Sequence, residues 1–162
     1  LERLAYVGAA VKSLRDQIDE RGKGLKPDDA LMKELGAFST RLDGFYGTLV
    51  ATREGRITGE VQLRERLGEL YGDVSGFAGR PTPSQLERAG ALDAEVTTAN
   101  ATFESISANE LREINAKLVA RGLAPLAPLG REEFEKRDAG RMSLNEVAAV
   151  GRRWFASRIL LR

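Results

Sequence analysis

Histidine and cysteine are both missing from the 162 residues of this chain. Their absence excludes a disulfide framework, a cysteine nucleophile, a histidine general base and the common zinc sites. Acid-base chemistry would fall to carboxylates, lysine or tyrosine. Glu65 and Glu69 stand one helical turn apart, but the pattern around them predicts a solvated face. We therefore expect no catalytic residue, no bound metal and no cofactor in this chain.

Long hydrophobic runs are also missing, since no stretch approaches the ~18 apolar residues that a membrane-spanning helix needs. The first residues lack the charged, apolar and small-residue order of a signal peptide. Because the chain starts at Leu1 rather than at Met, we expect a fragment of a longer protein. With five prolines, 42% hydrophobic and 30% charged residues, the composition is typical of a folded helical domain.

The net charge of +1 is divided unevenly along the chain. Residues 141–162 carry five arginines against Glu146, so residues 1–140 have a net charge of −3. We expect no nucleic-acid binding by this slightly acidic body.

Apolar residues recur at alternating intervals of three and four positions, the heptad pattern of helices that pack along one seam. The turn-forming segments 22–29 and 53–56 separate the first three such stripes, and short turns favour antiparallel neighbours. The stripes are Leu4, Val7, Val11, Leu14 and Ile18; then Leu31, Leu35, Phe38, Leu42, Phe45 and Leu49; then Leu63, Leu67, Leu70, Val74 and Phe77.

A fourth and longer helix is predicted over residues 83–121. Thr82, Pro83 and Gln85 fit an N-cap, a first-turn proline and the far member of a capping box. Arg121-Gly122-Leu123 fits a glycine-capped end. The apolar stripe slips between Ile106 and Leu111, which indicates either a stutter in a continuous helix or a break at Ser105-Ile106-Ser107. A continuous helix would be about 58 Å long, so its upper half would overhang the first two helices, kink or be covered by the tail.

Beyond residue 122 the prolines at 125 and 128 exclude helix, so an extended leucine-proline segment is predicted. One or two helical turns follow over 131–137, and Ser143 could cap a last helix. The predicted fold is all-α: an antiparallel four-helix bundle with heptad-type seams over residues 1–126. Residues 127–162 form an extension with a basic amphipathic C-terminal helix, packed on the bundle or projecting from it.

Three glycines, Gly68, Gly72 and Gly76, recur every four residues in the third helix and line one of its faces. Each should cost about 1 kcal/mol relative to alanine inside a helix. One explanation is the close approach of a neighbouring helix, with Gly44 and Gly47 of the second helix as its candidate contacts. The other is a groove in which another part of the parent protein docks.

Two further groups of residues leave alternatives open. Tyr71, Phe77 and Arg80 either flank the core or contact a partner. The basic tail contains Arg152, Arg153, Trp154 and Arg158, which could bind an anionic membrane or a polyanion. Its aromatic residues could instead close the end of the bundle, or the tail could be non-native. We expect no membrane contact except through residues 141–162.

The run from Leu67 to Thr82, LGELYGDVSGFAGRPT, resembles a segment in the C-terminal region of large bacterial BNR-repeat proteins with sortilin-like β-propellers. Phe103-Glu104, the stretch INAKL at 114–118 and the stretch ARGLAPL at 120–126 are similar to the end of that region. The match covers about residues 60–126. Such proteins are described as sialidase-like or glycosyl-hydrolase-like, but that chemistry would belong to the propeller, so no catalytic residue is carried over.

The resemblance implies a non-catalytic accessory domain of an exported protein, located in the periplasm or outside the cell. It would dock on the propeller of its own parent chain, or mediate assembly with another protein. The overhang of the long helix suggests a homodimer as a further possibility. The alternative function is a peripheral membrane or polyanion-binding module that acts through the basic tail.

Overall fold

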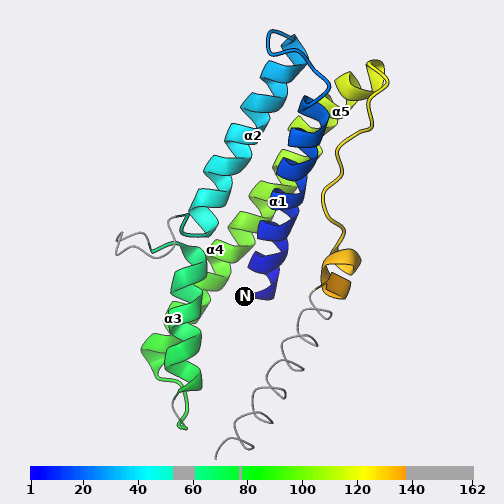
Figure 1. The fold of residues 1–162 in the computed structure, drawn as a ribbon. Helices are drawn as coiled ribbons and strands as arrows, with labels where there is room; N and C mark the ends of the chain where they lie inside the picture. Colours follow the sequence, from blue (N-terminus) through cyan, green and yellow to red (C-terminus); the bar gives the residue numbers. More distant parts are fainter. Residues whose placement is uncertain (53–60, 77, 138–162) are drawn as a thin grey trace, which may run out of the picture. The chain divides into compact units, whose positions relative to one another are not determined.

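The computed structural model describes residues 1–52, 61–76 and 78–137, which form five labelled α-helices, a short further helix over 131–137 and no strand (Figure 1). The all-α prediction is therefore confirmed for this part of the chain. The helices are α1 (Glu2–Gly22), α2 (Ala30–Leu49), α3 (Leu63–Ser75), α4 (Pro83–Ala108) and α5 (Glu110–Ala120). The chain divides into two compact units, Leu1–Pro128 and Leu129–Arg162. The domain boundary expected after residue 126 stays a prediction.

The helices α1 and α2 pack side by side through their heptad stripes (Figure 1). All five stripe residues of α1 are buried, and Val7, Val11 and Leu14 have no exposed surface. In α2 the stripe is buried except at Phe45, which is half-buried and stacks on Phe103 of α4 at 6.5 Å between ring centroids. The periodicity therefore predicted the buried faces of both helices correctly.

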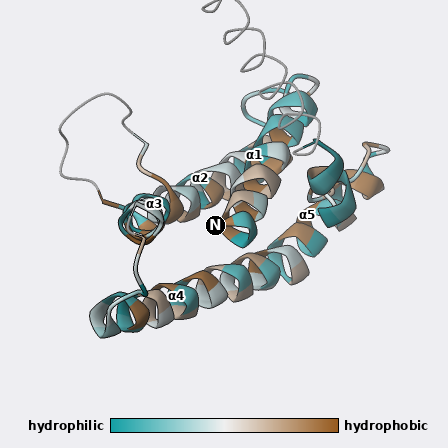
Figure 2. Cartoon of the chain, turned by 90° about the horizontal axis from the view of Figure 1, so that it is seen from below, coloured by the Kyte–Doolittle hydropathy of each residue, from teal (hydrophilic) through white to brown (hydrophobic). Residues whose placement is uncertain are grey.

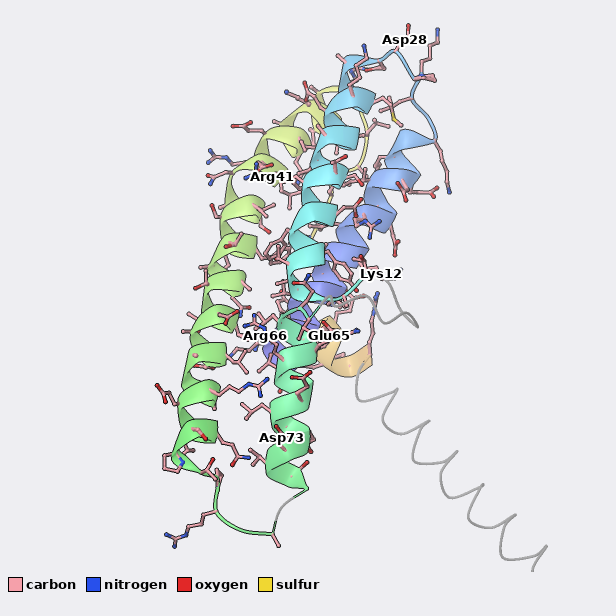
Figure 3. The ribbon with its side chains drawn as sticks, turned by 90° about the vertical axis from the view of Figure 1, so that its left-hand side faces the viewer. Lys12, Asp28, Arg41, Glu65, Arg66 and Asp73 are labelled. Atoms are coloured by element: carbon pink, nitrogen blue, oxygen red, sulfur yellow. The ribbon has the colours of Figure 1, made fainter. Side chains whose placement is uncertain are left out.

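Figures 1 and 3 show that α3 follows α2 and lies beside the first half of α4. Arg3, near the start of α1, pairs with Asp93 of α4 at 3.8 Å. The first turns of α4, before Asp93, therefore lie beyond the start of α1. Leu86 in these turns is 60% exposed. The overhang that we expected depended on a continuous helix over residues 83–121, whereas these first turns pack beside α3.

The long helix is broken at Asn109, which ends α4 and begins α5 with φ −104° and ψ −73°. A continuous helix would turn Ile106 and Leu111, five residues apart, toward different sides. With the break, both side chains are buried. The prediction of a break was therefore correct, but the break lies at Asn109, just after Ser105-Ile106-Ser107, and the continuous helix is wrong.

Both predicted ends of this long helical region are confirmed. The Thr82 hydroxyl accepts a hydrogen bond from the Gln85 N–H, and the Gln85 side chain accepts one from the Thr82 N–H at 2.8 Å. After α5, Gly122 adopts φ 70°, while the Leu123 N–H bonds the Leu118 carbonyl at 3.0 Å. This pair of features is a Schellman C-cap, which needs a residue that tolerates positive φ.

Figure 2 shows that every helix carries both hydrophilic and hydrophobic residues, as helices with one buried side require. In the second unit, the described residues include a short helix over 131–137. Its hydrogen bonds include one from the Phe134 N–H to the Gly130 carbonyl, and Arg137 pairs with Glu133. The predicted C-terminal helix after Ser143 lies outside the described residues.

Candidate functional site

The glycine face of α3, formed by Gly68, Gly72 and Gly76, is exposed. A Cβ atom added at Gly68 or Gly72 would meet no described atom within 4 Å, and the same holds at Gly44 and Gly47. The predicted close helix approach at these glycines is therefore wrong. The physical reason is that α3 buries Leu63 and Leu70, which lie on the opposite side of the helix.

Gly76 differs from the other two glycines because it is the C-cap of α3 and not an interior residue. A Cβ atom there would lie 3.0 Å from the Gly72 carbonyl oxygen of the same helix. The cost of an interior glycine thus applies to Gly68 and Gly72 only. These two positions weaken α3 without a compensating contact among the described residues.

Tyr71 lies between the glycines in sequence and is 65% exposed, the largest exposed fraction of any large hydrophobic side chain described. This exposure is inconsistent with a position flanking the core. Arg80 is exposed in the turn between α3 and α4, and Phe77 lies outside the described residues. The structure therefore brings Gly68, Tyr71 and Gly72 together on the solvent side of one helix.

The helix α3 is joined to α4 by ion pairs that the sequence pattern did not predict. Arg66 binds both carboxylate oxygens of Glu95, one of them at 2.8 Å, and Arg88 bonds Glu69 at 3.0 Å. The hydrogen bond from Arg66 holds the pKa of Glu95 below its usual value. Figure 3 shows Arg66 between α3 and α4. Helical spacing could not reveal these pairs because their members lie on different helices.

The carboxylates considered for acid-base chemistry have separate partners. Glu65 accepts a hydrogen bond from the Ala51 N–H at 3.1 Å and one from Arg64 at 2.9 Å, whereas Glu69 pairs with Arg88. Partial burial raises the pKa of Glu65, but these hydrogen bonds outweigh it and the pKa lies below its usual value. An ionised, hydrogen-bonded carboxylate of this kind anchors the chain after α2 to α3.

The surface of the described residues includes two open hollows that contain an arginine and a carboxylate. One of about 510 Å³ is lined by Arg15, Asp43, Tyr46, Val50, Ala51 and Thr52. The other, of about 450 Å³, lies at the break between α4 and α5 and is lined by Arg41, Thr98, Ala101, Thr102, Ser105, Ile106, Asn109 and Glu110. The arginine in each hollow already pairs with a carboxylate of the same hollow, Asp43 or Glu110.

Within the described ranges no polar or charged residue is buried, and no group of acidic side chains could hold a metal ion. The described helices also include none that is both long and apolar enough to cross a bilayer. The basic tail with Arg152, Arg153, Trp154 and Arg158 lies outside the described residues. The most distinctive surface feature is therefore the glycine face of α3.

Comparisons of this sequence with protein-family models, with curated proteins and with solved structures find no match. The resemblance to the C-terminal region of BNR-repeat proteins stays a prediction.

Proposed function

We propose that this chain is a non-catalytic interaction domain that docks on another protein surface through the glycine face of α3. The observation that carries the proposal is the open space around Gly68 and Gly72. Interior glycines cost about 1 kcal/mol each in a helix, and no helix of the described part packs on them. A partner that approaches the bare backbone closely would supply the missing compensation.

The composition of this face favours a protein partner. Tyr71 offers a large apolar ring with a polar hydroxyl, a side chain enriched at protein interfaces. Arg80 adds a positive charge in the turn that follows the same helix. The partner that the resemblance suggests is the β-propeller of the parent protein, and assembly with another protein is the alternative.

We further propose that α1–α2 and α3–α4 are the two antiparallel hairpins of the predicted four-helix unit, in which α3 continues the line of α2 and α5 continues α4 (Figures 1 and 3). The side-by-side packing within each hairpin supports this arrangement. A homodimer through the overhanging turns of α4 near Leu86 remains an alternative mode of assembly. Light scattering that finds only monomer at high micromolar concentration would contradict that alternative.

A pull-down of the parent chain with this domain tests the docking proposal. Gly72→Leu fills the open face of α3, whereas Gly36→Leu fills an equally open glycine position on α2. We expect the wild type and Gly36→Leu to retain the parent chain and Gly72→Leu to lose it, with all three proteins equally helical by circular dichroism. If both variants retained the parent chain equally, the glycine face of α3 would not be the docking surface. If the wild type did not retain the parent chain, the parent chain would not be the partner.

A further inference from the structure

Residues 123–128, which we call the Leu/Pro segment, lie between α1 and α5 and bond to side chains of both helices. We call the surface that Gln17, Arg21 and Asn115 form around this segment the groove. The chain leaves the end of α5 and runs beside α1 (Figure 1). Leu126 is only 2% exposed, so its side chain is an anchor within the groove. The segment has no regular secondary structure of its own, and its backbone groups must therefore find partners elsewhere.

Two side-chain amides supply those partners, one from each helix. Asn115 of α5 donates to the Leu126 carbonyl at 2.8 Å and accepts from the Leu126 N–H at 2.7 Å. Gln17 of α1 donates to the Ala127 carbonyl at 2.8 Å and accepts from the Ala127 N–H at 3.0 Å. An amide can do both because it carries a donor and an acceptor side by side.

The two prolines reduce the number of backbone N–H groups in the segment that need a partner. Pro125 and Pro128 have no N–H group, so Leu126 and Ala127 carry the two N–H groups between them, and both are bound. Arg21 of α1 adds a hydrogen bond to the Ala124 carbonyl at 2.9 Å. The groove therefore binds the backbone of an extended chain through hydrogen bonds and buries one leucine side chain.

The segment is attached to α5 through Gly122, whose φ of 70° allows the chain to reverse into the groove. A change at this one residue would swing the segment away while leaving the groove intact. The identical segment of another molecule could then make the same four amide hydrogen bonds. Exchange of identical elements is a low-cost route to a dimer, because each contact is replaced by its equivalent.

We propose that the groove between α1 and α5 is a binding site for an extended peptide, and that it can be filled by the Leu/Pro segment of a second copy of this chain. Two copies would exchange their segments about Gly122. This inference is independent of the function proposed above, because it uses neither α3 nor its glycine face.

Two complementary full-length variants test the exchange. One carries Leu126→Asp, which places a charge where the segment needs a buried leucine and leaves the groove intact. The other carries Gln17→Glu and Asn115→Asp, whose carboxylates would repel the Leu126 and Ala127 carbonyls, and it keeps an intact segment. We expect each variant alone to be monomeric by light scattering and their mixture to contain a 1:1 heterodimer.

The matched control combines all three substitutions in one chain, which then offers neither segment nor groove. Mixed with the Leu126→Asp variant, this triple variant should give no dimer. A purely monomeric mixture of the two complementary variants, both helical by circular dichroism, would overturn the proposal.

A second measurement decides the question if Leu126→Asp does not fold. Gly122→Ala strains the reversed chain, because alanine disfavours positive φ, whereas an exchanged chain can relax at this residue. After refolding at high protein concentration, we expect the dimeric fraction relative to monomer to rise on the order of tenfold over the wild type. A Gly122→Ala protein that stays as monomeric as the wild type would contradict segment exchange.

Discussion

Arg121, at the end of α5, donates a hydrogen bond to the same Asp29 carboxylate that caps the start of α2. One oxygen of Asp29 accepts from the Leu31 N–H at 2.8 Å, and the other accepts from the Arg121 guanidinium. The acidic residue lies at a helix N-terminus and the basic residue at a helix C-terminus, so each also suits the dipole of its own helix. This contact joins two helix ends that are far apart in the sequence.

The Asp29 contact predicts a pH dependence of stability. The hydrogen bond from Arg121 and, to a smaller extent, the one from the Leu31 N–H hold the pKa of Asp29 below its usual value of 3.8. Because the folded state binds this proton less tightly than the unfolded state, the stabilising contribution is present above the unfolded pKa. It is lost as the pH falls through the folded pKa. The affected window therefore lies below about pH 4.

Asp29→Asn keeps a capping oxygen but removes the charge. We expect this variant to have a lower urea midpoint than the wild type at about pH 6, and we expect the difference to shrink at about pH 2 as Asp29 takes up a proton. Urea unfolding followed by circular dichroism at both pH values measures the difference. The same midpoint difference at both would show that the charge of Asp29 contributes nothing.

The open glycines of α3 predict stabilising substitutions. Gly68→Ala and Gly72→Ala add a methyl group into open space and remove backbone entropy, so each should raise the free energy of unfolding by about 0.5–1 kcal/mol. Gly122→Ala should instead lower it by about 1–2 kcal/mol because of its positive φ. Denaturant titration distinguishes the two signs, and destabilisation by the α3 substitutions would indicate a neighbour on that face.

The capping box at the start of α4 predicts a loss of stability when the Thr82 hydroxyl is removed. Thr82→Ala should lower the free energy of unfolding by about 1 kcal/mol, because the Gln85 N–H loses its acceptor. Thr97→Ala is the matched control, since Thr97 is exposed within α4 and bonds only the Asp93 carbonyl of the preceding turn. Its effect should stay within about 0.5 kcal/mol. Equal effects at both positions would contradict a capping role.

The buried stripe of α1 predicts a large loss of stability when one of its central side chains is truncated. Leu14 has no exposed surface, so Leu14→Ala should lower the free energy of unfolding by about 2–5 kcal/mol through lost burial and a residual cavity. Leu86→Ala removes the same atoms from a side chain that is 60% exposed and should cost far less. Thermal or urea unfolding of both variants checks the contrast, which would vanish if the first turns of α4 were buried in solution.

Local signals in the sequence determined most of the helical structure. The stripe of α1, the capping box of Thr82 and Gln85 and the glycine end at Gly122 were all readable, because they depend on residues within a few positions of one another. The alternation of three and four also predicted the buried sides of α1 and α2. It did so without information about which helix would cover them.

Tertiary structure decided the candidate surfaces. The glycine pattern of α3 was visible in the sequence, but only the packing of Leu70 against another element turned Gly68 and Gly72 outward. Likewise, the prolines predicted an extended segment, whereas the amides that hold it belong to Gln17 and Asn115 on two different helices. Such pairings depend on how helices distant in the chain meet, and a local pattern in one sequence carries no record of that meeting.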